Sequence, residues 1–129
     1  MMNLREIDRL VAEKVMGWRL ENRRVNIWGQ EIGFWVNPKN NMIVAKYSGF
    51  REESFSPSTN IADAWKVVEK LKIAVIPQVG DPPKDMQYLA EIDRQPFGNY
   101  YEAFAETAEL AICLVALKSV GVEVEVTEQ

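Results

Sequence analysis

Three short motifs constrain the fold most, because each predicts the start of a helix. They share an asparagine followed three residues later by an acid: Asn3-Leu4-Arg5-Glu6, Asn60-Ile61-Ala62-Asp63 and Asn99-Tyr100-Tyr101-Glu102. The asparagine side chain can accept a hydrogen bond from an unpaired backbone N–H, and the positive end of the helix stabilises the acid. Each motif leads into apolar residues at helical spacing, so we expect three helices.

The three expected helices cover residues 4–16, 61–71 and 102–120. In the second helix, the apolar side that we expect to face the core consists of Ile61, Trp65, Val68 and Leu71. The third helix is apolar on nearly every side, and such a helix is buried on two sides. Either the first helix or another subunit is expected to cover its second side.

Strand-like patterns fill the stretches between these helices. β-branched and aromatic residues, bounded by turn residues, mark strands at residues 25–28, 32–36, 42–47, 72–76 and 87–94. In the last of these, Tyr88, Ala90 and Ile92 alternate with Gln87, Glu91 and Asp93, with Leu89 as the exception, as in a half-buried strand. The order α-β-β-β-α-β-β-α, with short connections, predicts an α+β fold with a mainly antiparallel sheet covered by helices. Residues 1–129 fit a single domain.

The chain has no histidine and one cysteine, Cys113. This composition removes Ser-His-Asp and Cys-His nucleophiles, histidine general bases and most zinc sites. Cys113 lies among apolar residues, so we expect it to be buried rather than reactive. The remaining option is carboxylate, lysine or magnesium chemistry, for which the best group is Asp81, Asp85, Glu91 and Asp93. A solvated acidic face explains that group as well, so we assign no catalytic residue, metal or cofactor.

The charge balance limits the partners. Fifteen basic and 19 acidic residues give a net charge of −4, which argues against sequence-independent binding of duplex nucleic acid. The first residues contain no apolar segment typical of a signal peptide, and no apolar run reaches the roughly 20 residues of a membrane span. We therefore expect a cytoplasmic protein.

Three segments are candidate binding sites. The first combines arginines, which can hold phosphate, with aromatic rings, which can stack on a base: Arg23, Arg24, Trp28, Phe50 and Arg51. Its alternative is that Trp28 and Phe50 belong to the core and the arginines are solvated.

The second segment offers hydroxyls and backbone N–H groups at a helix start, where an anion could bind: Ser56, Ser58, Thr59 and Asn60. Its alternative is a helix cap alone. The third is the loop around Tyr100, which could bind a ligand or pack against the sheet edge or a neighbouring subunit.

Three stretches together resemble the phage ABA sandwich domain family. They are Leu10-Val11-Ala12-Glu13-Lys14-Val15-Met16-Gly17-Trp18, Phe55-Ser56-Pro57-Ser58-Thr59-Asn60 with the following helix to Leu71, and Ala111-Ile112-Cys113-Leu114-Val115-Ala116-Leu117-Lys118 with Gly121-Val122. The Ser-Pro-Ser-Thr-Asn lead-in is also similar to a small family of accessory proteins from lambda-type phages. The resemblance implies an α-β-α sandwich encoded by a phage or prophage, and the family offers no catalytic residues to transfer. Residues 21–53 depart from the family pattern.

These observations favour a phage-encoded, non-enzymatic binding protein in the cytoplasm of the bacterial host. Our main hypothesis is a homo-oligomeric sponge that sequesters a nucleotide-derived host defence signal. One alternative is an adaptor or inhibitor that binds a host protein. The other is a carboxylate- or metal-dependent enzyme that processes nucleotides.

Overall fold

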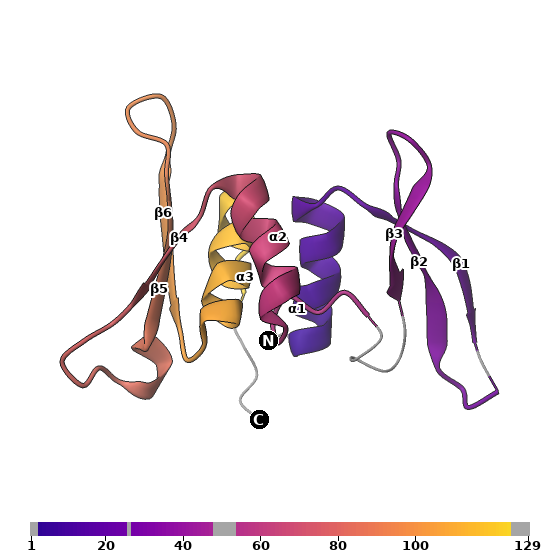
Figure 1. The fold of residues 1–129 in the computed structure, drawn as a ribbon, viewed down its shortest axis with the longest axis horizontal. Coiled ribbons are helices and arrows are strands. Elements are labelled where there is room, and N and C mark those ends of the chain that lie inside the picture. Colours follow the sequence, from indigo (N-terminus) through magenta and orange to yellow (C-terminus); the bar gives the residue numbers. More distant parts are fainter. Residues whose placement is uncertain (1–2, 26, 48–53, 125–129) are drawn as a thin grey trace.

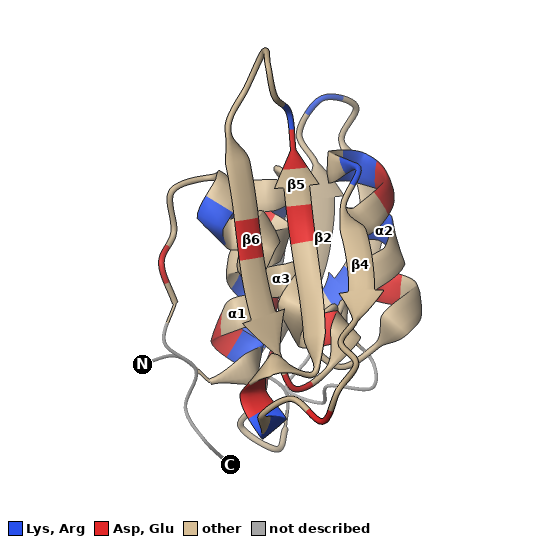
Figure 2. Cartoon of the chain, turned by 90° about the vertical axis from the view of Figure 1, so that its left-hand side faces the viewer, with Lys and Arg blue, Asp and Glu red and all other residues tan. Residues whose placement is uncertain are grey.

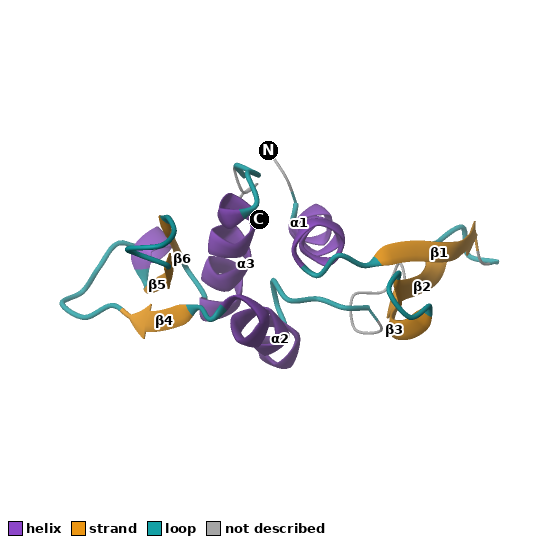
Figure 3. Cartoon of the chain, turned by 90° about the horizontal axis from the view of Figure 1, so that it is seen from above, coloured by secondary structure: helices purple, strands orange, loops and turns teal. Residues whose placement is uncertain are grey.

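A layer of helices lies between two three-stranded antiparallel sheets (Figure 1; Figure 3, from above). The computed structural model describes residues 3–25, 27–47 and 54–124. The elements in chain order are α1 (Leu4–Leu10), the π-helical turn η1 (Val11–Val15), β1 (Arg19–Val25), β2 (Glu31–Asn37), β3 (Met42–Tyr47), α2 (Ile61–Leu71), β4 (Ala74–Pro77), the 3-10 turn η3 (Lys84–Met86), β5 (Tyr88–Asp93), β6 (Tyr100–Ala105) and α3 (Ala108–Ser119). The predicted α+β class is confirmed, but the layer order is β-α-β rather than the expected α-β-α, because the strands form two sheets and the helices lie between them.

The first helical segment begins and ends as its sequence predicts. The Asn3 side chain accepts a hydrogen bond from the Glu6 backbone N–H at 2.9 Å. At Gly17 the backbone adopts φ +74°, a region that glycine enters without a steric penalty, and the helix ends there. The apolar side of α1 and η1 is buried in the core through Ile7, Val11 and Val15.

The start of α2 is also as predicted, but the side that faces inward differs. The Asn60 side chain accepts hydrogen bonds from the backbone N–H groups of the first turn. Ile61 and Trp65, which we expected inside, are 53% and 52% exposed. The buried residues are Ala64, Val67 and Val68, which contact α3. Smaller side chains at a helix contact let the two axes approach closely. This close packing explains why the small Ala64 faces inward while the larger Ile61 and Trp65 are exposed.

The third Asn motif does not start a helix. Residues 100–105, which we assigned partly to the third helix, form β6 and pair with β5 from Tyr88↔Ala105 to Asp93↔Tyr100. Thr107 caps α3 instead, and its side chain accepts from the Leu110 N–H at 3.2 Å. Strand pairing satisfies the backbone of this aromatic segment along its whole length, which a cap at Asn99 could not do.

The apolar helix α3 is the centre of the core. One side contacts β5 and β6, and the other contacts α2 and η1 of the same chain. Its second apolar side is therefore covered within the chain, by α2 and by the first helical segment, α1 with η1, which is one of the two expected alternatives. Cys113 is fully buried here as predicted, and burial raises the pKa of its thiol. Among the described helices, none is long and apolar enough to cross a membrane.

The two sheets contribute different residues to the core. In the first sheet, order β1-β2-β3, Trp35 is 1% exposed on the face toward the helices. β1 starts earlier than we expected and ends at Val25, so Trp28 lies in the following turn and is 73% exposed. In the second sheet, order β4-β5-β6, Ala90 and Ile92 are buried, which confirms the predicted alternation.

Candidate functional site

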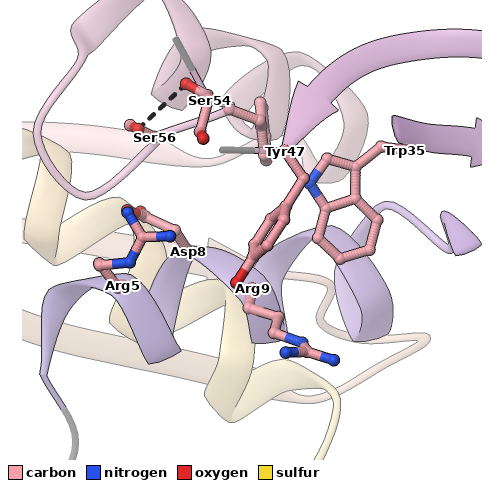
Figure 4. A pocket seen from close by; sticks show the side chains of 8 residues that line it. Arg5, Asp8, Arg9, Trp35, Tyr47, Ser54 and Ser56 are labelled. Atoms are coloured by element: carbon pink, nitrogen blue, oxygen red, sulfur yellow. Dashed lines mark hydrogen bonds between the residues drawn. The ribbon is translucent and has the colours of Figure 1, made fainter. Parts of the chain in front are cut away.

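A shallow hollow lies between α1, the first sheet and the segment that leads into α2 (Figure 4). Its enclosed part measures about 10 Å³, the room of about one water molecule, and about 260 Å³ when the mouth open to solvent is included. The lining combines two arginines, three aromatic rings, two serines and one acid: Arg5, Asp8, Arg9, Trp35, Tyr47, Ser54, Phe55 and Ser56. A ligand larger than water would therefore lie mainly at the mouth.

The two arginines lie one helical turn apart on α1 and share one aromatic partner. The guanidinium carbons of Arg5 and Arg9 are 5.7 Å and 5.9 Å from the centre of the Tyr47 ring. A cation over a ring face is attracted by the negative potential of that face. Tyr47 ends β3, and its ring meets Trp35 edge-on at 5.9 Å, so the aromatic floor is tied to the core. Positive charge and an aromatic face therefore meet at this one place.

Arg9 also has acidic neighbours. Its Nε donates to Glu13 Oε1 at 3.0 Å, and its Nη1 is 3.9 Å from Glu31 Oε1. The hydrogen bond to Glu13 raises the pKa of Arg9, so the guanidinium stays charged at every physiological pH. An incoming anion would compete with Glu13 for this donor.

The opposite wall is the segment from Ser54 to Ser56. The Ser56 hydroxyl donates to the Ser54 carbonyl at 3.0 Å, and the Ser56 N–H donates to the Asp63 carboxylate at 2.9 Å. Between them Phe55 is buried and meets the Trp18 ring edge-on at 4.8 Å. These contacts hold the wall of the hollow in one conformation.

A buried acid joins this segment to α1. Asp8 is 6% exposed, and its carboxylate accepts from the Ser58 N–H at 2.8 Å. The Ser58 hydroxyl lies 3.5 Å from the Leu4 carbonyl, at the limit of a hydrogen bond. Because Asp8 and Asp63 both accept from this lead-in, some of the N–H groups that we considered for an anion are used by the chain itself.

Among the predicted site residues that the structure describes, only Ser56 lines the hollow. Ser58 is buried against α1, Thr59 is exposed, and Asn60 caps α2. Arg24 is exposed on β1, and Tyr100 lies on β6 in the other sheet. The predicted set is therefore not one cluster.

Part of the predicted arginine and aromatic group cannot be placed. Phe50, Arg51 and the side chain of Arg23 lie outside the described residues. The alternative that assigned Trp28 to the core is wrong, because the β1–β2 turn leaves this side chain outside the sheet.

The acids that we considered for metal chemistry have other contacts. Glu91 accepts from the Tyr100 hydroxyl at 2.7 Å, and Asp93 accepts from the Gln95 N–H at 3.0 Å. Within residues 3–25, 27–47 and 54–124, no group of three or more Cys, Asp or Glu side chains could hold a metal ion. The hollow is the better developed site.

Sequence reasoning missed Arg5, Arg9 and Tyr47. A usable signal was present, because two arginines at positions i and i+4 of a helix point to the same side. That Tyr47, far along the chain, would lie beneath both arginines depends on how β3 packs.

Comparison with known proteins agrees with this fold. The phage ABA sandwich domain family model matches residues 9–117. The crystal structure of a phage protein from Bacillus cereus is similar, with 27% sequence identity, a TM-score of 0.62, and coverage of 97% of this chain and 94% of that chain. No functionally curated protein matches the sequence.

Proposed function

This chain belongs to the phage ABA sandwich domain family, and we propose that it is a phage-encoded binding protein that captures a small anionic, nucleotide-like ligand without converting it. The observation that carries the proposal is the pair Arg5 and Arg9 above the Tyr47 ring, at the mouth of the hollow. Guanidinium groups bind phosphate through paired N–H donors, and an aromatic ring can stack on a base. In a phage, such capture would remove a nucleotide-derived signal of the host defence.

The shape of the hollow supports capture at its mouth. Its enclosed volume is too small for a whole nucleotide, so a phosphate group would sit between the arginines while the rest of the ligand lies outside. The Ser54 hydroxyl is on the facing wall and could donate to the same phosphate, whereas the Ser56 hydroxyl already donates to the Ser54 carbonyl.

The test is retention of intact ligand. Purified protein is incubated with ADP-ribose or 3′,5′-cyclic AMP and desalted, then denatured, and the released material is identified by mass spectrometry. We expect unaltered nucleotide at a fixed ratio to protein. Release of a chemically changed nucleotide would show catalysis instead, and retention of neither probe would contradict the proposal.

A matched pair of variants locates the site. We expect Arg5→Ala to weaken binding by about 10- to 100-fold, because a hydrogen bond to a charged group contributes about 1.5–3 kcal/mol. Arg24→Ala removes the same charge from an exposed position on β1 and should leave the affinity unchanged. Equal losses in both variants would mean a general charge effect rather than this site.

An adaptor role is the second candidate, and the unexpected exposure of α2 favours it. Ile61 and Trp65 lie one turn apart and are each about half exposed. Exposed apolar side chains on one helix side are typical of protein contacts. Trp65→Lys should abolish a stoichiometric complex with a host protein if α2 makes that contact, while Lys66→Ala at the next position should not.

A further inference from the structure

Each sheet has one face against the helices and one face turned away from them. Because the sheets lie on opposite sides of the helical layer, their outer faces point in opposite directions (Figure 1). Side chains alternate between the faces of a strand, so the residues of each outer face follow from the strand register. The two outer faces differ in charge.

The outer face of the second sheet is acidic. Its positions are those that alternate with the buried Ala90 and Ile92: Ala74, Ile76, Leu89, Glu91, Asp93, Tyr100, Glu102 and Phe104. Three of these residues are acids and none is basic. Figure 2 shows the acidic bands on β5 and β6, with no basic band on β4, β5 or β6.

Two of these acids are held side by side. Glu91 and Glu102 are direct cross-strand partners, an arrangement that is unfavourable for like charges. The Tyr100 hydroxyl lies within hydrogen-bond distance of both, 2.7 Å from Glu91 and 2.9 Å from Glu102. These bonds raise the pKa of Tyr100, so it remains a donor between the two carboxylates. The two carboxylates are thus held together as one centre of negative charge on this face.

The outer face of the first sheet is basic. Its positions alternate with Trp35: Arg19, Glu21, Arg24, Ile32, Phe34, Val36, Ile43 and Lys46. Three of these residues are bases, and one is an acid, Glu21, which pairs with Arg19. The side chains of Arg24 and Lys46 are exposed.

Each outer face also has an apolar row separate from the main core. Ile76, Leu89 and Phe104 are cross-strand neighbours on the second sheet. Ile32 and Phe34 lie on β2 of the first sheet, beside Val36, which is already buried within the protein. Ile76 is exposed and the other four are half-buried, and none of these five packs against the main core cluster, so both rows can be covered further from outside.

We propose that the outer face of the first sheet binds the outer face of the second sheet in a neighbouring copy of the chain, giving head-to-tail self-association. The occupant is a second copy because the chain supplies both partners: an apolar row with basic residues, and an apolar row with acidic residues. Complementary charge brings the right faces together, and the apolar rows contribute burial. This inference does not depend on the anion site at α1.

The size of the contact sets its strength. Strands of six residues in a three-stranded sheet give a face of about 20 Å by about 14 Å, below the usual size of a stable interface. The association is therefore weak and depends on concentration. Because the contact joins two different faces, each added copy leaves one face of each kind open, and larger assemblies follow.

Sedimentation velocity over a range of protein concentrations tests the proposal. We expect the mean mass to rise with concentration at low salt and to return to that of the monomer near 1 M salt, where charges are screened over a few ångströms. A chain that remains monomeric at millimolar concentration and low salt would overturn the proposal.

Two neutralised variants test which faces meet. Glu91→Gln/Glu102→Gln and Arg24→Gln/Lys46→Gln should each weaken self-association by about tenfold or more, since each removes one side of the charge match. Mixed in equal amounts, they retain one intact pair of faces and should form a 1:1 dimer and nothing larger. Glu69→Gln/Glu123→Gln is the control, with the same change in net charge as the first variant but outside both faces. A symmetric dimer that neither variant weakens would contradict the head-to-tail contact.

Discussion

The two sheets share the same plan of three antiparallel strands, but they contact the helical layer to different extents. The second sheet turns three alanines toward the helices, Ala90, Ala103 and Ala105, beside the larger Tyr88, Ile92 and Tyr101, and its strands contact α3 closely. The first sheet turns the large rings of Trp35 and Tyr47 toward α1. The alanines let the backbones of β5 and β6 approach α3, whereas the rings of Trp35 and Tyr47 fill a wider gap beside α1.

This difference explains where the candidate site lies. Between α1 and the first sheet, the rings fill the centre of the gap but leave a hollow at its edge, where Arg5 and Arg9 reach the Tyr47 ring. On their inner faces, the first sheet therefore lines the candidate ligand site, whereas the second sheet packs on α3.

The largest expected effect on stability comes from removing Trp35, whose ring packs the first sheet against the helices. Trp35→Ala should lower the free energy of unfolding by about 3–5 kcal/mol, because a buried large side chain is lost and a cavity remains. Trp28→Ala removes the same side chain from an exposed turn and should change it by less than about 0.5 kcal/mol. Urea denaturation measures both, and equal effects would mean that Trp35 does not support the sheet.

The close contact of the second sheet can be broken by adding volume. Ala90→Leu should destabilise the protein by about 1–3 kcal/mol, because no space exists for the larger side chain between β5 and α3. Ala74→Leu makes the same change at an exposed position of β4, and thermal unfolding should show little effect there. Tolerance of leucine at position 90 would contradict the close packing.

The pH dependence of stability tests the burial of Cys113 in the core. Burial raises the pKa of the folded thiol, while the unfolded thiol titrates near its ordinary value of about 8.5. The folded state therefore keeps a proton that the unfolded state loses, and this contribution to stability is present below about pH 8.5 and falls as the pH rises.

The expected slope is up to about 1.4 kcal/mol of unfolding free energy per pH unit above that value. Urea denaturation at several values between pH 7 and 9.5 should show this decrease, and Cys113→Ala should remove it. The same slope in both proteins would mean that the thiol is not protected.

The smallest expected effect on stability comes from Glu13, which contacts Arg9 of the candidate binding site. Glu13→Gln weakens a half-exposed i,i+4 ion pair with Arg9, which costs about 0.3–0.5 kcal/mol. Because Glu13 competes for the guanidinium, we expect tighter binding of ADP-ribose in calorimetry. Glu6→Gln, elsewhere on α1, is the control, and weaker binding by the Glu13 variant would contradict this role of Arg9.

The sequence predicted most of the secondary structure because many of its signals act locally. Asn3 and Asn60 cap their helices through backbone groups within three residues, so spacing alone identified them. The motif at Asn99 has the same form but precedes β6. Pairing of this segment with β5 depends on residues about ten positions away, which no local signal describes.

The prediction of the candidate site was limited in the same way, because its residues come from distant parts of the chain. We expected one site of arginines, aromatic rings and hydroxyls, yet Arg24, Trp28 and Tyr100 lie on different parts of the surface. Arg5 and Arg9 were readable as a pair on one helix side. Their aromatic partner was not, because Tyr47 reaches them only through the packing of the first sheet on α1.

By itself, the sequence determined the helix starts at Asn3 and Asn60, the burial of Cys113 and the alternation along β5, because each depends on neighbours within a few residues. Only the tertiary structure decided that α2 turns Ala64 rather than Trp65 inward, that two separate sheets form, and that Tyr47 lies against Arg5 and Arg9. These features depend on the volumes of side chains that meet across the core, and residues far apart in the chain set those volumes together.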